Sequence, residues 1–143
     1  MIFQTTKLIR FHQCDPAGIV FYPQYLVLCN ETVEDWFAQA HGVDFYDLHA
    51  IHRRGVPMRH LEADFLAPSV HGEELVFSLV VEKVGASSIA IRIEAAREGA
   101  VRFRARQILV WADIEGPRAI PIDDAWRARF ERYLETPAAT EEP

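Results

Sequence analysis

The chain has 143 residues, of which 50% are hydrophobic and 25% charged, and its formal net charge is −6. This length and composition predict a single globular domain that buries roughly two-thirds of its unfolded surface, so that its core needs neither a disulfide nor a metal. The negative charge argues against nucleic acid as the main partner, because proteins that bind duplexes are usually basic.

Cysteine usage and hydropathy indicate where the protein works. Cys14 and Cys29 form no closely spaced pair, which is typical of a reducing compartment. The first residues lack the pattern of a secretory signal, and no apolar run approaches the roughly 20 residues of a membrane span. We therefore expect a cytoplasmic protein without a membrane partner. We also expect one domain over residues 1–135, followed by a disordered tail at residues 136–143, which are rich in Pro, Ala and Glu.

The predicted elements begin with a short strand at residues 5–11, which leads into a turn of sequence Asp-Pro-Ala-Gly at residues 15–18. Residues 23–41 are the best helix candidate, since apolar side chains recur there at steps of three and four residues. Pro23 suits the first turn of that helix, and Gly42 suits the position just after its end.

Four strand candidates follow the helix, and apolar and polar residues alternate most clearly in the last two. They lie at residues 59–66, 74–84, 88–96 and 101–114. Short breaks between them favour antiparallel pairing, mostly as successive hairpins. A last helix is expected at residues 123–134. This order predicts an α+β fold in which one long apolar helix packs against one curved antiparallel sheet.

Residues 14–25, which read Cys-Asp-Pro-Ala-Gly-Ile-Val-Phe-Tyr-Pro-Gln-Tyr, are the stretch best suited to chemistry. Pro16 favours an extended backbone at Asp15, and so aims its carboxylate. The predicted helix start offers unpaired N–H groups, including those of Tyr22 and Gln24, to an anion or a carbonyl oxygen. A carboxylate beside amide donors suits acyl transfer. The same spacing also suits a structural role, in which Asp15 caps its own turn.

This stretch resembles the active-site motif of the 4-hydroxybenzoyl-CoA thioesterase family over a dozen consecutive positions, and a looser likeness covers most of the chain. The resemblance implies the hot-dog fold, in which a curved antiparallel sheet wraps a long central helix. It also implies hydrolysis of an acyl-CoA, in particular an aryl-CoA such as 4-hydroxybenzoyl-CoA, to the free acid and CoA. A related short-chain branch carries histidine where this chain has Tyr22.

The resemblance further implies roles for individual residues. Asp15 is implied to be the catalytic carboxylate, either as the nucleophile or as the general base for water. The Tyr22 N–H is implied to polarise the thioester carbonyl, with the Phe21 and Tyr22 side chains beside the acyl group. Tyr25, which also lies at the start of the predicted helix, is a further substrate-binding candidate. Arg118 matches a basic position of the family and is implied to help hold the nucleotide of CoA.

Assembly and cofactors are also implied by the resemblance. Sites in the family form between subunits, so we expect a homodimer or a homotetramer. No metal or redox cofactor is implied, because the CoA arrives as part of the substrate. One departure is that residues 85–88, which read Gly-Ala-Ser-Ser, lack the basic hairpin that the hydroxybenzoyl-CoA enzyme uses for the nucleotide.

Two other functions stay open at this point. Hot-dog dehydratases and hydratases usually pair a histidine with an acidic residue, but no histidine lies between Asp15 and His41. A non-catalytic acyl-CoA-binding protein is the alternative from another class. Neither is favoured by the motif at residues 14–25.

Three further groups of residues have competing interpretations. Cys14 is a candidate nucleophile if His12 lies on the same strand face, although a space-filling role is the default. His49 and His52 lack a third ligand at a recognised metal spacing. The arginines at positions 102, 104 and 106 suit either phosphate binding or, more simply, a solvated outer face of the sheet.

Overall fold

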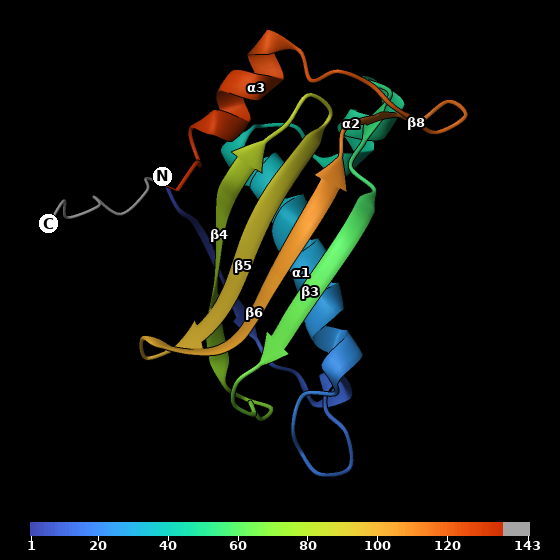
Figure 1. The fold of residues 1–143 in the computed structure, drawn as a ribbon. Coiled ribbons are helices and arrows are strands. Elements are labelled where there is room, and N and C mark those ends of the chain that lie inside the picture. The colour runs from blue at the N-terminus through green and yellow to red at the C-terminus, as the bar shows by residue number, and fades with distance from the viewer. Residues whose placement is uncertain (136–143) are drawn as a thin grey trace, which may run out of the picture.

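The computed structural model describes residues 1–135, so the expectation for residues 136–143 falls outside the described part (Figure 1). A long helix, α1 (Tyr22–Asp35), lies against one face of a five-stranded antiparallel sheet of order β1-β4-β5-β6-β3. The strands are β1 (Phe3–Leu8), β3 (Met58–Phe65), β4 (Glu74–Val84), β5 (Ser88–Arg97) and β6 (Ala100–Val110). The predicted α+β architecture is confirmed.

Shorter elements complete the fold. They are η1 (Phe11–Gln13), α2 (Phe45–Ala50), α3 (Asp124–Glu131) and a small sheet of β2 (Arg54–Gly55), β7 (Ala112–Asp113) and β8 (Arg118–Ala119). α2 is an element that was not predicted from the sequence, although Asp44 is a recognisable N-cap residue, and its side chain accepts from the Asp47 N–H at 2.8 Å. None of the helices in residues 1–135 has the length and apolar character needed to span a membrane.

The central helix ends where the sequence predicts, but in a wider turn. After α1 the backbone continues as a π-helix, η2 (Trp36–Ala40). Gly42 follows with a φ of 70°, and the Val43 N–H returns to the carbonyl oxygen of Phe37 at 3.1 Å. A positive φ costs glycine little, which explains why the helix stops at this residue.

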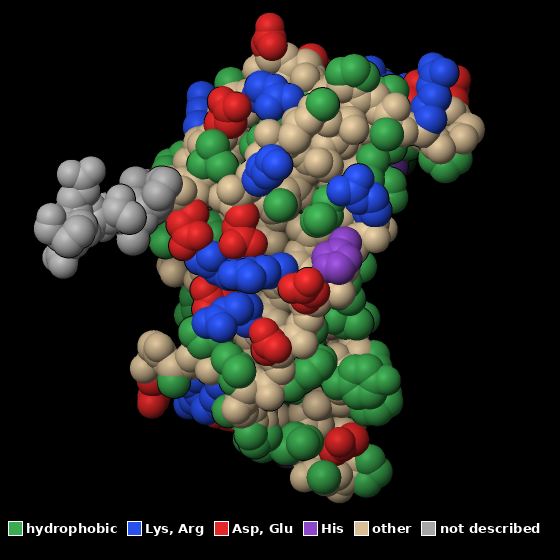
Figure 2. Space-filling view, in the orientation of Figure 1, with side chains coloured by type: hydrophobic (Ala, Val, Ile, Leu, Met, Phe, Trp, Pro, Cys, Tyr) green, Lys and Arg blue, Asp and Glu red, His purple; other side chains and the backbone are tan. Residues whose placement is uncertain are grey.

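The core lies between α1 and the inner face of the sheet. Trp36 and Phe37 have no exposed surface and belong to this core. Alternate residues of the strands point at the helix, and the largest of these are Phe77, Ile91 and Phe103. The opposite face of the sheet carries charged side chains of both signs (Figure 2).

The strand pairing corrects one expectation. β4, β5 and β6 form successive hairpins, as predicted, but β3 pairs with β6 rather than with β4. The free edge of β4 is taken by β1, which pairs with it over six positions, so β3 has to pair at the opposite edge. Residues 66–73 therefore form a crossover connection between edge and interior strands. The strand expected at residues 5–11 is also shorter, because its last part turns into η1.

Candidate active site

Asp15 lies in a tight turn directly before α1. The Gly18 N–H donates to the carbonyl oxygen of Asp15 at 2.9 Å, and the Asp15 N–H donates to the carbonyl oxygen of Ile19 at 2.9 Å. Gly18 has a φ of 81°, a conformation that glycine adopts without strain. The turn predicted at residues 15–18 is therefore confirmed.

The two oxygens of the Asp15 carboxylate have different surroundings. Oδ1 accepts a hydrogen bond from the Ala17 N–H at 2.8 Å, which is the capping role that Asp often plays in turns. Oδ2 has no hydrogen-bond partner among residues 1–135, and the side chain is half-buried. The structural and the chemical role are thus compatible, since each uses a different oxygen.

The start of α1 offers one unused amide donor next to this turn. Phe21 is the N-cap, Tyr22 is the first helical residue, and Pro23 has no N–H to donate. The Tyr22 N–H has no hydrogen-bond acceptor within the described part of the chain. The Gln24 N–H, which the sequence analysis counted as available, donates instead to the carbonyl oxygen of Phe21 at 2.8 Å. A helix start with a free N–H favours an oxygen that carries negative charge.

Aromatic rings line this end of the molecule. Phe21 and Tyr22 are 48% and 60% exposed, and Tyr22 packs edge-on against Phe65 of β3 with 6.0 Å between ring centroids. Tyr25 differs, because only 4% of it is exposed and its ring stacks on Phe103 at 4.5 Å. Phe21 and Tyr22 therefore face solvent, whereas the Tyr25 ring is buried against Phe103 and Phe65.

A polar cluster that the sequence analysis missed lies below the turn. Arg102 Nη1 donates to Ser69 Oγ at 3.2 Å and to Glu73 Oε1 at 2.8 Å, and Glu73 also accepts from the Val70 N–H at 2.8 Å. The hydrogen bond from Arg102, and then that from Val70, hold the pKa of Glu73 below its usual range. These residues come from β6 and the crossover connection, so no local motif could have revealed them.

The same connection holds the Asp15 turn in place. The Val20 N–H donates to the carbonyl oxygen of Ser69 at 2.9 Å, and Ile19 forms an isolated β-bridge with Val70. Arg102 and Glu73 therefore support the turn through the backbone of residues 69 and 70. They contact no part of the Asp15 carboxylate.

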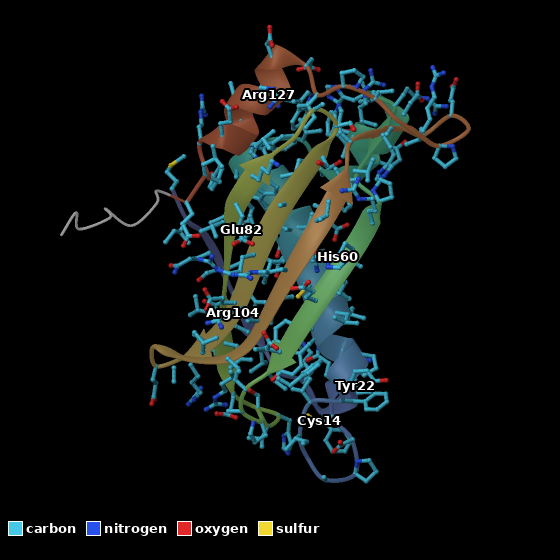
Figure 3. The ribbon with its side chains drawn as sticks, in the orientation of Figure 1. Cys14, Tyr22, His60, Glu82, Arg104 and Arg127 are labelled. Atoms are coloured by element: carbon cyan, nitrogen blue, oxygen red, sulfur yellow. The ribbon has the colours of Figure 1, made fainter. Side chains whose placement is uncertain are left out.

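Arg118 lies far from this cluster within one chain. It is exposed on β8, at the opposite end of α1 from Tyr22 and Cys14 (Figures 1 and 3). The hairpin between β4 and β5 also lies at that far end, where the carbonyl oxygen of Gly85 accepts from Arg127 at 2.8 Å. One chain therefore places Asp15, Phe21 and Tyr22 at one end of α1 and leaves Arg118 at the other.

The structure weakens the case for a Cys14 nucleophile. His12 lies in the short helix η1, so the expectation that His12 and Cys14 share a strand face is wrong. The Cys14 thiol instead lies 3.7 Å from the carbonyl oxygen of Arg10. Local backbone chemistry explains the difference, because the Gln13 and Cys14 N–H groups return to residues 10 and 11 and wind the chain into a 3-10 turn.

The histidines and the arginines of β6 do not form further sites. No group of three potential metal ligands occurs among residues 1–135, which includes His49 and His52. Arg104, labelled in Figure 3, is paired with Glu94, and Arg106 is paired with Glu82. Both pairs lie on the outer face of the sheet, where charges of both signs gather (Figure 2). This pairing supports the interpretation of a solvated outer face.

Comparison with known proteins places the chain in a family. A family model described as the Thioesterase-like superfamily matches residues 9–130, and the chain therefore belongs to this superfamily. The 1,4-dihydroxy-2-naphthoyl-CoA hydrolase of Nostoc punctiforme is 30% identical over 94 residues, which are 66% of this chain and 63% of that protein. The match thus spans a little less than two-thirds of the relative's length.

Solved structures confirm the hot-dog fold. A thioesterase-superfamily protein from Jannaschia sp. CCS1 superposes with a TM-score of 0.88 at 23% identity, over 94% of each chain. A 1,4-dihydroxy-2-naphthoyl-CoA thioesterase from Synechocystis gives a TM-score of 0.78 at 21% identity, over the whole of both chains. The expected superfamily is confirmed, whereas these relatives are not named as 4-hydroxybenzoyl-CoA thioesterases.

Proposed function

We propose that the protein is an acyl-CoA thioesterase with Asp15 as its catalytic carboxylate. The observation that carries the proposal is the free Oδ2 of Asp15, held in a rigid turn just before a helix whose first N–H, at Tyr22, has no acceptor in residues 1–135. Membership of the Thioesterase-like superfamily and the likeness to a naphthoyl-CoA hydrolase support it.

Two routes fit this arrangement, and both use the Tyr22 N–H to stabilise negative charge on the thioester oxygen. In the first, Asp15 attacks the carbonyl carbon, the C–S bond breaks, and CoA leaves as the thiolate. Water then hydrolyses the mixed anhydride and restores the carboxylate. In the second, Asp15 takes a proton from water as that water attacks the carbonyl carbon. Neither route calls for a metal or a redox cofactor.

The exposed rings favour an aryl acyl group of the 4-hydroxybenzoyl type. Phe21 and Tyr22 can each stack on a flat substrate for about 0.5–1.5 kcal/mol beyond area burial. Two such contacts amount to about 1–3 kcal/mol, or roughly five- to a hundred-fold in kcat/KM over an aliphatic acyl group of similar size. Tyr25 packs against Phe65, and Phe65 packs against Tyr22.

We further propose that the protein works in the cytoplasm as a closed homo-oligomer. β3 lies at the edge of the sheet, and edge strands are a common place for subunits to pair. Since Arg118 lies at the far end of its own chain, we propose that it serves the nucleotide in the site of a second copy. Light scattering at micromolar concentration tests the assembly, and a fully active monomer would contradict it.

A thiol-release assay tests the activity. Asp15→Asn keeps the turn, because an amide oxygen still accepts from Ala17, but it removes the base or nucleophile. We expect a loss of at least roughly 100-fold in rate with an unchanged fold. Asp124→Asn, an exposed carboxylate in the first turn of α3, is the matched control and stays at the wild-type rate. An Asp15→Asn variant near the wild-type rate on the best substrate would refute the assignment.

The choice of substrates in the same assay separates the competing functions. Benzoyl-, 4-hydroxybenzoyl- and phenylacetyl-CoA are compared with hexanoyl-CoA, and we expect the aryl esters to be hydrolysed at least several-fold better. A preference for hexanoyl-CoA would refute the aryl assignment alone. A non-catalytic acyl-CoA-binding protein would bind the esters without releasing thiol. The hydratase alternative pairs an acidic residue with a histidine in the region of the central helix, but His41, the first histidine after Asp15, follows η2 at the other end of α1.

A further inference from the structure

One polar side chain stands out on the inner face of the sheet. Gln107 lies on β6 in the row of side chains that points at α1, and its neighbours in that row are Ala105 and Leu109. Its partners in the adjacent strands are Leu61 of β3 and Ile91 of β5. Only 6% of Gln107 is exposed, and it is the polar member of an otherwise apolar row.

No hydrogen bond joins this amide to another residue of the described part of the chain, yet its nitrogen and oxygen are not among the fully buried atoms that lack a partner. The amide therefore keeps access to solvent through the cavity that it lines. Its hydrogen-bonding groups remain free for a molecule that enters this cavity.

Gln107 faces a cavity that provides room for such a partner. The cavity has a volume of about 180 Å³ and lies between α1, β3 and β6, with Leu26, Leu61 and Leu109 in its walls and Asn30 beside them. A cavity of roughly 150 Å³ is large enough for benzene. No charged side chain lines it within the described residues, so it suits one neutral ring with a small substituent.

The cavity lies further along the same helix and the same edge strand as the candidate active site. Leu26 follows Tyr22 by four residues on α1, which places it about 6 Å further along the helix axis on nearly the same face. On β3, Phe65 packs against Tyr22, and Leu61 precedes it by four residues on the same side of the strand. An acyl group whose carbonyl oxygen meets the Tyr22 N–H would thus extend between helix and strand towards Gln107.

We propose that Gln107 determines specificity by hydrogen bonding a hydroxyl or a similar neutral substituent on the ring of the acyl group. The inference rests on the proposed thioesterase function and deepens it. An amide both donates and accepts, so it matches a hydroxyl in either sense. A charged substituent is excluded, because the lining offers no opposite charge to compensate its burial.

The test compares 4-hydroxybenzoyl-CoA with benzoyl-CoA, which differ by one hydroxyl. The wild type is expected to prefer the hydroxylated ester by about ten-fold or more in kcat/KM. Gln107→Met keeps the volume and removes the hydrogen bond, so the ratio falls to about one, mainly through loss on the hydroxylated ester. Gln39→Met, at an exposed position of η2, is the control and leaves the ratio unchanged. If Gln107→Met keeps the wild-type preference for 4-hydroxybenzoyl-CoA over benzoyl-CoA in kcat/KM, the inference is overturned.

Two further measurements keep the inference separate from the activity. Equilibrium binding of both esters to Asp15→Asn, with and without Gln107→Met, reports the same preference without turnover, and an equal effect on both esters overturns it. Thermal unfolding gives a second criterion, since Gln107→Met should hold or raise Tm if the amide is unpartnered, whereas a clear fall in Tm would show a structural role. A wild type that cleaves neither ester refutes the thioesterase proposal, and the binding ratio still decides the role of Gln107.

Discussion

The two ends of the central helix are both rich in aromatic residues, but these residues are exposed at one end and buried at the other. At the start of α1, Phe21 and Tyr22 are 48% and 60% exposed. At the other end, Trp36 and Phe37 in η2 have no exposed surface. Hydrophobic composition is similar at both ends, so it does not tell them apart.

The C-terminal end of the central helix, at η2, is covered by α3, and we call it the covered end. α3 packs Trp126 and Phe130 onto η2, with ring centroids 5.7 Å apart for Phe37 and Trp126 and 5.6 Å apart for Trp36 and Phe130. The Asp123 side chain caps this helix by accepting from the Trp126 N–H at 2.9 Å. These aromatic residues stabilise the fold through burial.

The near end has no such cover within residues 1–135. Its backbone is nevertheless held firmly, because the Asp15 turn is hydrogen bonded within itself and to the crossover connection. A well-fixed backbone beneath exposed aromatic rings is typical of a preorganised binding surface and not of an incompletely packed core. Exposure together with a fixed backbone, and not aromatic content, therefore distinguishes the end of α1 at which we propose the active site.

The largest effect is expected on stability, from removing a buried ring at the covered end, where α3 packs on η2. Phe130→Ala removes a fully buried ring between η2 and α3, so the free energy of unfolding should fall by about 3–5 kcal/mol. Urea unfolding measures it, and Tyr46→Ala, at an exposed ring, is the control with little change. Activity per folded molecule should stay at the wild-type level. A loss of activity in molecules that remain folded would mean that the two ends are not separate.

Low pH should also destabilise the covered end, because His41 lies there. Burial, followed by the charges of Arg129 and Arg132, lowers the pKa of His41 to about 4. The unfolded chain therefore binds a proton between about pH 6.5 and pH 4 that the folded chain does not, and the free energy of unfolding falls as the pH drops through this window. After allowance for the partial exposure of the ring, we expect a loss on the order of 1–2 kcal/mol.

His41→Phe tests this assignment, because it keeps an aromatic ring and removes the titration. Urea unfolding at pH 7 and pH 5 should show a smaller difference for His41→Phe than for the wild type. His52→Phe, at an exposed histidine, should keep the wild-type difference. Equal pH dependence in wild type and His41→Phe would assign the effect to other groups.

The smallest effect is expected on kcat, from weakening the contacts that support the Asp15 turn at the start of α1. Glu73→Gln weakens the bond with Arg102 and the cap on the Val70 N–H, so the connection that supports the Asp15 turn becomes less fixed. Since a small displacement of a catalytic group lowers the rate, we expect kcat to fall by about three- to ten-fold with KM nearly unchanged. Glu74→Gln, the exposed neighbour, is the control. Loss of stability with an unchanged kcat would show that Glu73 supports only the fold.

Much of the fold followed from local sequence patterns. The Asp-Pro-Ala-Gly turn at residues 15–18, the helix from Tyr22 and its end before Gly42 depend on contacts between neighbours in the chain. The strand at residues 74–84 was predicted with its observed bounds, because side chains alternate along it with a period of two. In the same way, the motif at residues 14–25 pointed to Asp15 and Tyr22 before any contact was known.

Contacts between distant segments were decided by the tertiary structure. Pairing of β3 with β6 depends on β1 occupying the edge of β4, and no local pattern carries that information. The bond of Arg102 with Glu73 and the position of Gln107 in the wall of a cavity likewise depend on different strands and connections. The central helix, the main strands after it and the turn at residues 15–18 could be predicted from the sequence, since they follow from local backbone preferences and periodicity. Strand order, the residues that support the turn and the lining of the cavity came only from the tertiary structure, since these depend on how separate elements pack.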